Sequence, residues 1–340
     1  MNKMRKGIAF DDILLIPQYS DIESRKEVDI SSQLSGEIKL SLPILSAPMD
    51  RVTESTMANA MAEMGGLGVI HRYNTIEEQL EIVKKASVCS HRACAIPATG
   101  DFLERAKALV TEGGVRVLCV DIAHAHHIHM KNALDALKTY FGDNIHLMAG
   151  NVATLQAFND LSDWGADSIK VGIGGGSICS TRILTGHGMP TLQSVYECSK
   201  SDRNTVLIAD GGIKTSGDMV KALAFGADLV MIGSLLSGTS QAPGDIHYNA
   251  DGKPYKQYRG MASKEAQNDW RGRSASIEGV AHYVPYKGCV KKILKDLDNG
   301  IRSGLSYSGA RSIRKLQATM KVIEQTSAGQ FESSTHIKSK

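Results

Sequence analysis

The stretch IHLMAGNVATLQAFNDLSDWGADSIKVGI, residues 145–173, contains two short apolar runs separated by a segment with a helical pattern. The runs IHLMAG (145–150) and SIKVGI (168–173) are continuous rather than alternating, which is typical of strands buried on both faces. Parallel strands need a crossover connection, and that connection is usually a helix. The stretch therefore predicts one strand-helix-strand unit of an α/β fold.

The same pattern recurs along the whole chain. Between the apolar runs lie helical patterns such as TIEEQLEIVKKA (75–86) and FLERAKALVTEG (102–113). Eight such units without a G-x-G-x-x-G fingerprint favour a closed (β/α)₈ TIM barrel over a doubly wound open sheet. We expect one catalytic domain over residues 1–340. The apolar runs are 42–47, 67–71, 93–98, 116–123, 145–150, 168–173, 205–211 and 228–234.

Two regions near the C-terminus depart from the repeat. The segment from about 235 to 287 is rich in Gly, Ser, Asn and charged residues. Long connections of this kind are usually functional, so we expect a loop or small hairpin carrying a mobile flap over the barrel mouth. After it, CVKKILKDLDNGI (289–301) predicts the final helix, and residues 321–340 form a C-terminal tail.

The composition argues against several classes of protein. The 340 residues are 42% hydrophobic and carry a formal net charge of only +3, with 5% aromatics, so we expect no nucleic-acid partner. No uncharged stretch reaches the ~18 residues that a membrane span needs, and Asp11 and Asp12 interrupt the apolar N-terminal part, unlike a secretory signal. The six cysteines form no C-x-x-C pair, which predicts reduced thiols and a cytoplasmic location.

Polar residues follow most of the predicted strands, where a TIM barrel carries its catalytic groups. We expect them to meet at one mouth. They are Ser46, Asp50, His71, Arg72, Asp121, His124, Asn151, Cys179, Thr181 and Asp210. The histidines of HAHHIH (His124, His126, His127 and His129) match no common metal-ligand spacing, so they predict a solvated helix start.

Glycine-rich loops follow the sixth, seventh and eighth strands. TIM barrels often bind phosphate there, because glycine lets backbone N–H groups approach an anion closely. Asp210-Gly211-Gly212 and Gly233-Ser234 supply two of these loops, and Ser177 adds a hydroxyl from the third. One such loop alone would indicate only a tight turn, but three successive loops predict a phosphate site.

Cys179 lies at a strand-to-helix junction behind the glycines of KVGIGGGSICSTR (170–182). Backbone N–H dipoles at such a junction favour a thiolate, and Thr181 two residues later could relay a proton. A nucleophile and a packed free cysteine both remain open for Cys179 on these grounds. For Cys119, inside a strand, and Cys198, inside a helix, we expect packed thiols.

Ten motifs give the chain a resemblance to the family of IMP dehydrogenases and GMP reductases, nearly end to end. They are FDDILLIP (10–17), SAPMD (46–50), GGLGVIH (65–71), AGNVAT (149–154), KVGIGGGSICSTR (170–182), TGHGMP (185–190), ADGGIK (209–214), MIGS (231–234), YRGMAS (258–263) and VPYKG (284–288). The resemblance implies a barrel homotetramer. It also implies that Cys179 attacks purine C2 while hydride moves between C2 and a nicotinamide cofactor.

Three features favour the reductase branch. Only KASVCSHR (85–92) stands where dehydrogenases usually carry a regulatory insert, so we expect no insert domain. The short flap Ser263–Ile277 lacks the dehydrogenases' Arg-Tyr pair, since Arg271 follows Trp270 instead. Thr181 and Glu278 match the reductases' proton relay. The resemblance therefore implies NADPH-dependent reductive deamination of GMP to IMP and ammonia. The alternatives are a compact IMP dehydrogenase and a non-catalytic regulator that binds purine nucleotides.

The resemblance also implies the remaining site residues. The implied catalytic residues are Cys179, Thr181 and Glu278. The implied substrate-binding residues are Met49, Ser177, Asp210, Gly211, Gly212, Gly233, Ser234, Gly260, Met261 and Gly279. Cofactor binding falls to Ser24, Arg25, Arg72, Asp121, Ile122, Ala123, Ile173, Gly174 and Ser303, with Arg25 placed to pair with the 2′-phosphate of NADPH.

Two features of the chain are unusual for a reductase. The tail GQFESSTHI (329–337) resembles the potassium-binding tail of the dehydrogenases. It implies a K⁺ site at the carbonyls of Gly174, Gly176 and Cys179, completed by Glu332 and Ser333 of a neighbouring subunit. Gly175 stands where the family usually has proline.

Overall fold

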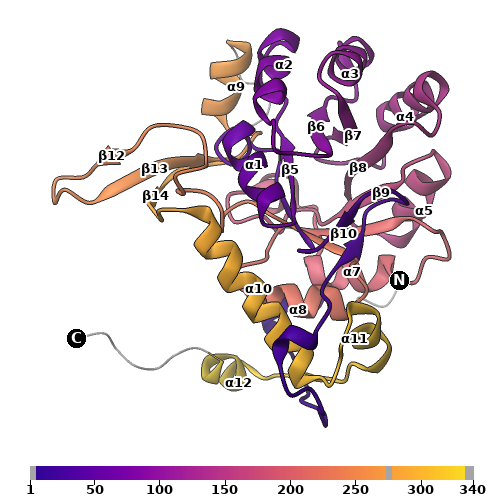
Figure 1. Cartoon of the computed structure of the whole chain (residues 1–340), viewed down its shortest axis with the longest axis vertical. Helices are drawn as coiled ribbons and strands as arrows, with labels where there is room; N and C mark the ends of the chain where they lie inside the picture. Colours follow the sequence, from indigo (N-terminus) through magenta and orange to yellow (C-terminus); the bar gives the residue numbers. More distant parts are fainter. Residues whose placement is uncertain (1–4, 273–277, 334–340) are drawn as a thin grey trace.

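The computed structural model describes residues 5–272 and 278–333 and shows a closed barrel of eight parallel strands (Figure 1). The last strand pairs with the first, since Val230 lies opposite Ile44. Each predicted apolar run overlaps one strand, so the TIM-barrel prediction is confirmed and the open sheet is excluded. The strands are β4 (Ile44–Ser46), β5 (Leu67–Ile70), β6 (Arg92–Ile96), β7 (Val115–Asp121), β8 (His146–Val152), β9 (Ser168–Val171), β10 (Val206–Asp210) and β11 (Leu229–Ile232).

Helices follow the strands and cover the outside of the barrel, as α2 to α5 show in Figure 1. In α2, Thr75 Oγ1 accepts from the N–H of Glu78, and the Glu78 carboxylate accepts from the N–H of Thr75. This reciprocal cap fixes the helix start, and Leu80 and Val83 are buried. The helices are α1 (Ser55–Glu63), α2 (Ile76–Lys85), α3 (Phe102–Thr111), α4 (Ile128–Phe141), α5 (Leu155–Asp163), the short α6 (Thr181–Thr185), α7 (Thr191–Cys198), α8 (Ser216–Ala224) and α10 (Val290–Tyr307).

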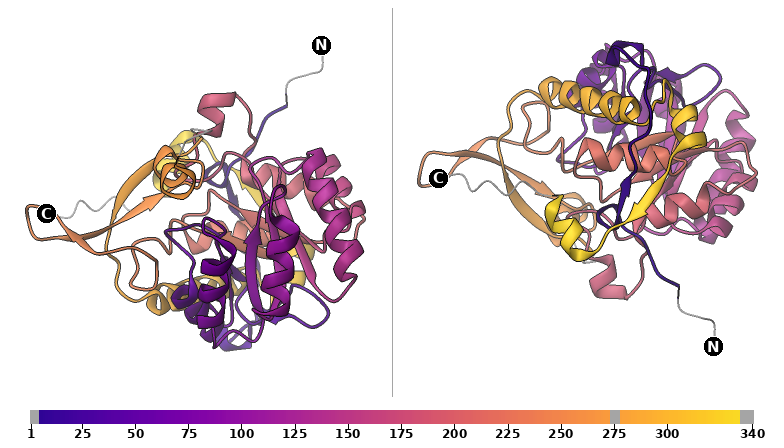
Figure 2. Two further views of the ribbon diagram at one scale, coloured as in Figure 1. Left: turned by 90° about the horizontal axis from the view of Figure 1, so that it is seen from above. Right: turned by 90° about the horizontal axis from the view of Figure 1, so that it is seen from below.

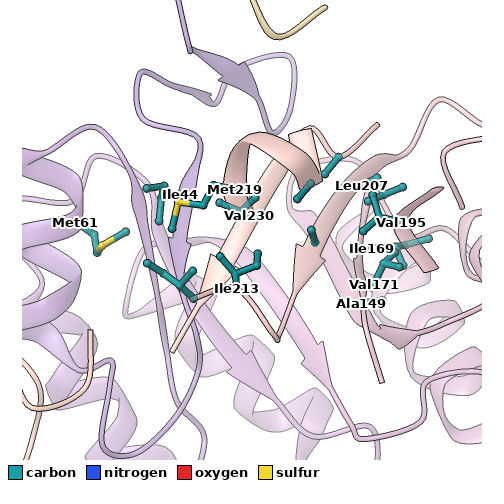
Figure 3. Packing of buried hydrophobic residues seen from close by; sticks show 14 of the residues in the cluster. Ile44, Met61, Ala149, Ile169, Val171, Val195, Leu207, Ile213, Met219 and Val230 are labelled. Atoms are coloured by element: carbon teal, nitrogen blue, oxygen red, sulfur yellow. The ribbon is translucent and has the colours of Figure 1, made fainter. Parts of the chain in front are cut away.

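Alternate residues of each strand serve two different cores, because side chains along a strand point to opposite faces. Ile169 and Val171 of β9 point outward and pack with helix residues such as Val195 of α7 (Figure 3). Inward-facing residues, such as Val117 and Met148, fill the barrel interior. The interior is therefore packed with side chains and is not a pore.

A small hairpin closes the amino end of the barrel. It consists of β2 (Ser32–Gln33) and β3 (Lys39–Leu40), which pair antiparallel. Its apolar residues Leu34, Ile38 and Leu40 are buried in the same cluster as the barrel-interior residues. These side chains cover the amino end of the barrel interior.

The predicted loop or hairpin at 235–287 is more ordered than the sequence suggested. It forms a three-stranded antiparallel sheet of β12 (His247–Tyr248), β13 (Pro254–Arg259) and β14 (Ala281–Pro285), with α9 (Lys264–Arg271) between the last two strands. Both views of Figure 2 show the β12–β13 end projecting away from the barrel. Residues 273–277 of the predicted flap lie outside the described residues, and the predicted mobility of the flap stays a prediction.

The C-terminal prediction was wrong in one respect, since the segment 289–301 is not the final helix. It belongs to α10, which runs on to Tyr307, and α11 (Ile313–Thr319) and α12 (Ser327–Glu332) follow. Between these two helices, β15 (Val322–Glu324) pairs antiparallel with β1 (Ile13–Leu15) near the N-terminus. This pairing joins the two ends of the sequence, which local patterns do not reveal. Residues 334–340 of the predicted tail lie outside the described residues, and the short helical turns η1 (Phe10–Asp12) and η2 (Arg25–Glu27) complete the elements.

Two smaller predictions are confirmed, the helix start at HAHHIH and the missing insert between α2 and β6. The HAHHIH segment is a helix start, since α4 begins at Ile128 and the side chain of His127 accepts from the N–H of His129. Within residues 5–272 and 278–333, no group of His, Cys, Asp and Glu has the geometry of a metal site. Residues 86–91 alone join α2 to β6, so no insert domain is present there. No helix in the described part of the chain is long and apolar enough to cross a bilayer.

Candidate active site

A cavity of about 480 Å³ opens at the carboxyl end of the barrel. Its walls come from loops after seven of the strands, and the flap region supplies the rest through Tyr258, Gly260, Met261, Gln267 and Glu278. Because the strands are parallel, their carboxyl ends lie at one end of the barrel, and residues far apart in sequence meet there. The predicted residues that line it are Met49, Arg72, Asp121, Ile122, Ala123, Ile173, Gly174, Gly176, Ser177, Cys179, Thr181, Asp210, Gly211, Gly212, Gly233, Ser234, Gly260, Met261 and Glu278.

The reactive groups form a hydrogen-bonded row on one wall of this cavity. The half-buried thiol of Cys179 donates to Thr181 Oγ1 at 3.2 Å, and the Thr181 hydroxyl donates to Glu278 Oε2 at 2.8 Å. Backbone pairing brings the flap to the thiol, since the N–H of Ser180 donates to the carbonyl of Glu278 and that of Val280 to the carbonyl of Ile178. The row therefore links a nucleophile to a carboxylate through one hydroxyl.

The glycines before Cys179 allow a very close approach of neighbouring backbone. A Cβ at Gly172 would lie 2.0 Å from the carbonyl oxygen of Asp210, and one at Gly175 would lie 2.4 Å from Thr191 Oγ1. Thr191 is buried, and its hydroxyl has no hydrogen-bond partner. The Thr191 side chain thus occupies the space that a residue larger than glycine would need, which is a physical reason for Gly175 where the family resemblance implies proline.

Tyr258 of β13 is a lining residue that the sequence analysis did not assign. Burial raises the pKa of its phenol to about 12, although a hydrogen bond with Ser177 opposes the shift, so the hydroxyl stays protonated at neutral pH. Its oxygen also lies 3.9 Å from the sulfur of Met49. The hydroxyl therefore stands between Ser177, on the predicted phosphate side, and Met49, on the predicted base side. Its place in the YRGMAS motif was the available signal.

Another part of the cavity lining carries an arginine and two carboxylates. Arg72 donates to the backbone carbonyl of Asp121 at 3.1 Å, and Asn151 donates to Asp210 Oδ2 at 2.8 Å. Lys170, which the sequence analysis did not assign, forms ion pairs with Asp121 and Asp210. This wall thus combines anionic oxygens with fixed cations close to the thiol row.

Side-chain contacts hold the flap against the barrel in the described structure. Trp270 of α9 stacks on Tyr73 with ring centroids 4.2 Å apart, and the Arg72 guanidinium lies 5.8 Å from the Trp270 ring. Arg259 of β13 pairs with Asp50 at 2.6 Å and also with Asp269 of α9. These contacts place the flap beside the cavity, with Glu278 in reach of Thr181.

Eight predicted residues do not line the cavity of this chain. Four of them, Ser46, Asp50, His71 and His124, were expected at the same mouth from their places after the strands. The other four come from the family resemblance. Ser24 and Arg25 belong to the η2 region, and Ser303 belongs to α10, which contacts η2. Gly279 lies behind the wall, because a Cβ there would come within 2.9 Å of the N atom of Ser263. Its role in this structure is close packing of the flap backbone.

A larger groove of about 1190 Å³ lies at the amino end of the barrel. It is lined by the β2–β3 hairpin and by the starts of several strands, including His146 and Val206. None of the predicted site residues lines this groove. Since barrel enzymes carry their chemistry at the carboxyl end, the smaller cavity is the candidate active site.

Comparison with known proteins agrees with the geometry. The family model described as "IMP dehydrogenase / GMP reductase domain" matches residues 7–336. Inosine-5′-monophosphate dehydrogenase of Nitrosopumilus maritimus is 34% identical over an alignment that covers 98% of this chain and 99% of the relative. That alignment spans 473 positions, more than the 340 residues of this chain, so the relative carries long segments without a counterpart here.

Reductases are similar to the same extent. A GMP reductase of Leishmania major is 32% identical over 98% of this chain and 98% of the relative. The structure of GMP reductase from Trypanosoma brucei in complex with guanosine 5′-monophosphate superimposes with a TM-score of 0.92 and 30% identity, covering 99% of both chains.

Proposed function

The chain belongs to the IMP dehydrogenase/GMP reductase family, and on that premise we propose that it is a GMP reductase, converting GMP to IMP and ammonia at the expense of NADPH. Membership makes it an oxidoreductase of purine nucleotide metabolism. The observation that carries the choice of reaction is the row Cys179–Thr181–Glu278, because an amine leaving group needs a proton donor at the reacting carbon.

In the first half of the proposed reaction, the sulfur of Cys179 bonds to C2 of GMP and the exocyclic amino group leaves as ammonia. The Cys179 thiol first gives up its proton along the row, through Thr181 to Glu278, and the same row then returns this proton to the departing amine. The products are ammonia and a purine held by a C2–S bond. In the second half, a reduced nicotinamide bound beside the purine would supply a hydride to C2. The C–S bond would then break, IMP would be released, and the Cys179 thiolate would take up one proton from solvent.

The loops assign the parts of the nucleotide to parts of the cavity. Backbone N–H groups of Gly211, Gly212 and Gly233 and the hydroxyls of Ser177 and Ser234 would bind the phosphate. Asp210 would accept from the ribose hydroxyls, and Met49, Gly260 and Met261 would pack against the base. Gly279 would act by its packing, which lets Glu278 reach Thr181.

The wall around Arg72 and Asp121 would receive the nicotinamide half of the cofactor, together with Ile122, Ala123, Ile173 and Gly174. Ser24, Arg25 and Ser303 lie outside the cavity of their own chain, so we propose that they reach the cofactor from a neighbouring subunit of a homotetramer. Arg25 would then pair with the 2′-phosphate of NADPH.

Several finer points belong to the same proposal. Carbonyl oxygens of Gly174, Gly176 and Cys179 lie in one loop, which suits the oxygen preference of a hard cation such as K⁺. All six cysteines are free thiols, which supports a cytoplasmic location. Light scattering on the purified protein, with and without K⁺, measures the assembly, and a mass close to one chain under both conditions would contradict the tetramer.

One assay separates the reductase from a compact IMP dehydrogenase, which the similar dehydrogenases keep as the second candidate. The purified protein is mixed with GMP and NADPH in one arm and with IMP and NAD⁺ in the other, and nicotinamide absorbance is followed. We expect oxidation of NADPH in the first arm only, lost in Cys179→Ala and kept in Cys289→Ala, whose exposed thiol lies outside the cavity. Turnover in the second arm alone would establish the dehydrogenase.

A non-catalytic nucleotide-binding regulator would turn over neither pair. Labelling with a 6-halopurine nucleotide tests this case separately, because only an activated thiol next to a bound purine reacts. We expect modification of Cys179 and protection by GMP. Binding of GMP without labelling or turnover would favour the regulator.

A further inference from the structure

The barrel interior contains a buried ammonium group that the proposed reaction does not use. Lys170 of β9 points into the barrel, because its neighbours Ile169 and Val171 point outward into the helix layer. Its side chain is only 2% exposed. A buried charge is costly unless partners compensate it, so the partners of Lys170 indicate what holds it there.

Those partners come from strands on both sides of β9. The ammonium contacts Asp121 Oδ1 at the end of β7 and lies 3.7 Å from Asp210 Oδ2 at the end of β10. In the register of the barrel, Asp121 is opposite Gly150 of β8, and Gly150 is opposite Lys170. A Cβ at Gly150 would lie 2.6 Å from the Cβ of Lys170. The missing side chain thus lets Lys170 reach across β8 to β7.

The two carboxylates belong to different halves of the cavity. Asp121 precedes Ile122 and Ala123, on the wall proposed for the nicotinamide, and Asp210 precedes the glycines proposed for the nucleotide phosphate and ribose. One ammonium therefore holds a carboxylate of each half. A role in barrel stability alone would not require Lys170 to contact both carboxylates.

We propose that Lys170 is a positioning residue whose ammonium group binds the carboxylates of both Asp121 and Asp210. It thereby keeps the binding carboxylate of the cofactor half of the cavity close to that of the nucleotide half. This inference rests on the proposed function of the cavity.

The surrounding charges explain how removal of Lys170 would act. Burial lowers the pKa of Lys170, but Asp121, Cys119 and Asp210 outweigh it and the net pKa is raised, so the group is a cation at every accessible pH. Burial raises the pKa of Asp210, while Lys170 and Asn151 oppose that shift. Without the ammonium, the pKa of Asp210 should rise further. The charged and titratable groups facing the cluster are Asp121 and Cys119 from β7, Asp210 from β10, Arg72 after β5 and Tyr258 from β13.

The test compares Lys170→Met with Lys138→Met. Lys138 of α4 also pairs with two carboxylates, Asp143 and Asp167, but it lines the groove at the other end of the barrel. The measurement is the pH profile of kcat/KM, with KM for GMP and for NADPH determined separately. In Lys170→Met we expect both KM values to rise ~10-fold or more, as for loss of a buried charged hydrogen bond, and the acidic limb of the profile to move to higher pH. Lys138→Met should behave as wild type.

A folded Lys170→Met protein with wild-type KM values and an unmoved acidic limb would overturn the inference. If this variant does not fold, Asp121→Asn and the double variant Lys170→Met/Asp121→Asn decide, because the second substitution removes the uncompensated charge. The inference expects Asp121→Asn to raise only KM for NADPH and the double variant to raise KM for GMP as well. Equal KM values for GMP in the two proteins would contradict it.

Calorimetric binding of GMP separates failure of this inference from failure of the proposed function. If the wild type binds GMP without turnover, the reductase proposal fails. The role of Lys170 is then judged by the same comparison of GMP affinity across pH. Weaker binding in Lys170→Met with an acidic limb at higher pH supports it, and unchanged binding overturns it.

Discussion

The proposed proton route at the Cys179 thiol runs through the Thr181 hydroxyl and the Glu278 carboxylate, which come from separate segments of the chain. Thr181 lies two residues after Cys179 in the sequence, whereas Glu278 belongs to the flap region. Its carboxylate accepts a hydrogen bond from the Thr181 hydroxyl at 2.8 Å. Because a hydroxyl both accepts and donates, Thr181 can pass a proton only while both neighbours stay in contact. Among the single residues of the site, we therefore expect those of this row to be the most sensitive to substitution.

Thr181→Val should abolish this route while keeping the shape of the side chain. We expect kcat for GMP reduction to fall by ~10²–10⁴-fold, the usual contribution of general acid–base catalysis, with little change in GMP affinity. Steady-state kinetics and calorimetry measure the two quantities. Thr185→Val is the matched control, since Thr185 lies one turn further along α6 and is exposed, and its hydroxyl donates to the carbonyl of Thr181 and accepts from the N–H of His187. Equal loss of activity in both variants would refute the relay.

At the scale of elements, the glycine-rich loop packs against α7 where Gly175 meets Thr191. The hydroxyl of Thr191, in the first turn of α7, fills the space beside Gly175. A short loop that holds a nucleophile cannot shift by several tenths of an ångström without moving the thiol. Thr191 and Gly175 thus act as one unit.

Gly175→Ala should therefore be destabilising, by ~1–3 kcal/mol, as expected for overpacking in a rigid region. Thr191→Ala removes the oxygen that the new Cβ would strike, so the double variant should recover most of the lost stability and activity. Denaturant unfolding of the four proteins gives the coupling between the two positions. Strictly additive effects would show that the Thr191 contact does not limit position 175.

The flap is the second element whose place depends on a few contacts. Trp270→Ala removes the stack on Tyr73, which should weaken docking of α9 by ~0.5–1.5 kcal/mol. We expect faster reaction of Cys179 with a thiol reagent and a higher KM for GMP, because Glu278 and Tyr258 belong to the same flap region. Trp270→Phe keeps an aromatic ring and should stay close to wild type. Unchanged thiol reactivity in Trp270→Ala would contradict docking through this stack.

At the scale of the whole molecule, the barrel interior is polar at both ends and apolar between them. Lys170, Asp121 and Asp210 form the layer at the mouth, and His146 with Ser168 forms the layer at the floor. His146 is buried, and its Nε2 lies 2.8 Å from Ser168 Oγ. Burial lowers the pKa of His146 from its usual 6.5 to about 4.

This shift makes stability depend on pH in a defined direction. Between about 6.5 and about 4 the unfolded chain binds a proton at His146 that the folded chain does not, so the free energy of unfolding falls as the pH falls through this window. Asp210 and Asp228 have raised pKa values and act with the opposite sign, so the effect is read as a difference between two proteins. His146→Gln should flatten the pH dependence of the melting temperature, and His247→Gln, at an exposed position, should not. Equal slopes in all three proteins would refute this.

The repeat of apolar runs was enough to determine the barrel. A strand buried on both faces must be apolar throughout, and a crossover helix must carry an apolar stripe, so each β-α unit leaves a local trace in the sequence. The positions of Cys179, Asp210 and the glycine-rich loops followed, because the end of each strand fixes where its loop lies. The same local traces failed for β1 and β15, which are only three residues long and pair across almost the whole length of the chain.

Only the tertiary structure decided which side chains meet in the cavity. The sequence analysis assigned no role to Tyr258 or Lys170, although both lie within family motifs. Lys170 contacts Asp121 because of the strand register, and Tyr258 contacts Met49 because the flap region lies against the barrel mouth. Likewise, Ser24, Arg25 and Ser303 follow the family's motifs but lie away from the cavity of their own chain. Local patterns depend on the periodicity of one segment, whereas contacts such as Thr181–Glu278 and Lys170–Asp121 depend on long-range packing. For that reason the sequence by itself determined the fold and the place of Cys179 after a barrel strand, and the folded chain determined the hydrogen bonds of Cys179, Thr181 and Glu278 and the ion pairs of Lys170.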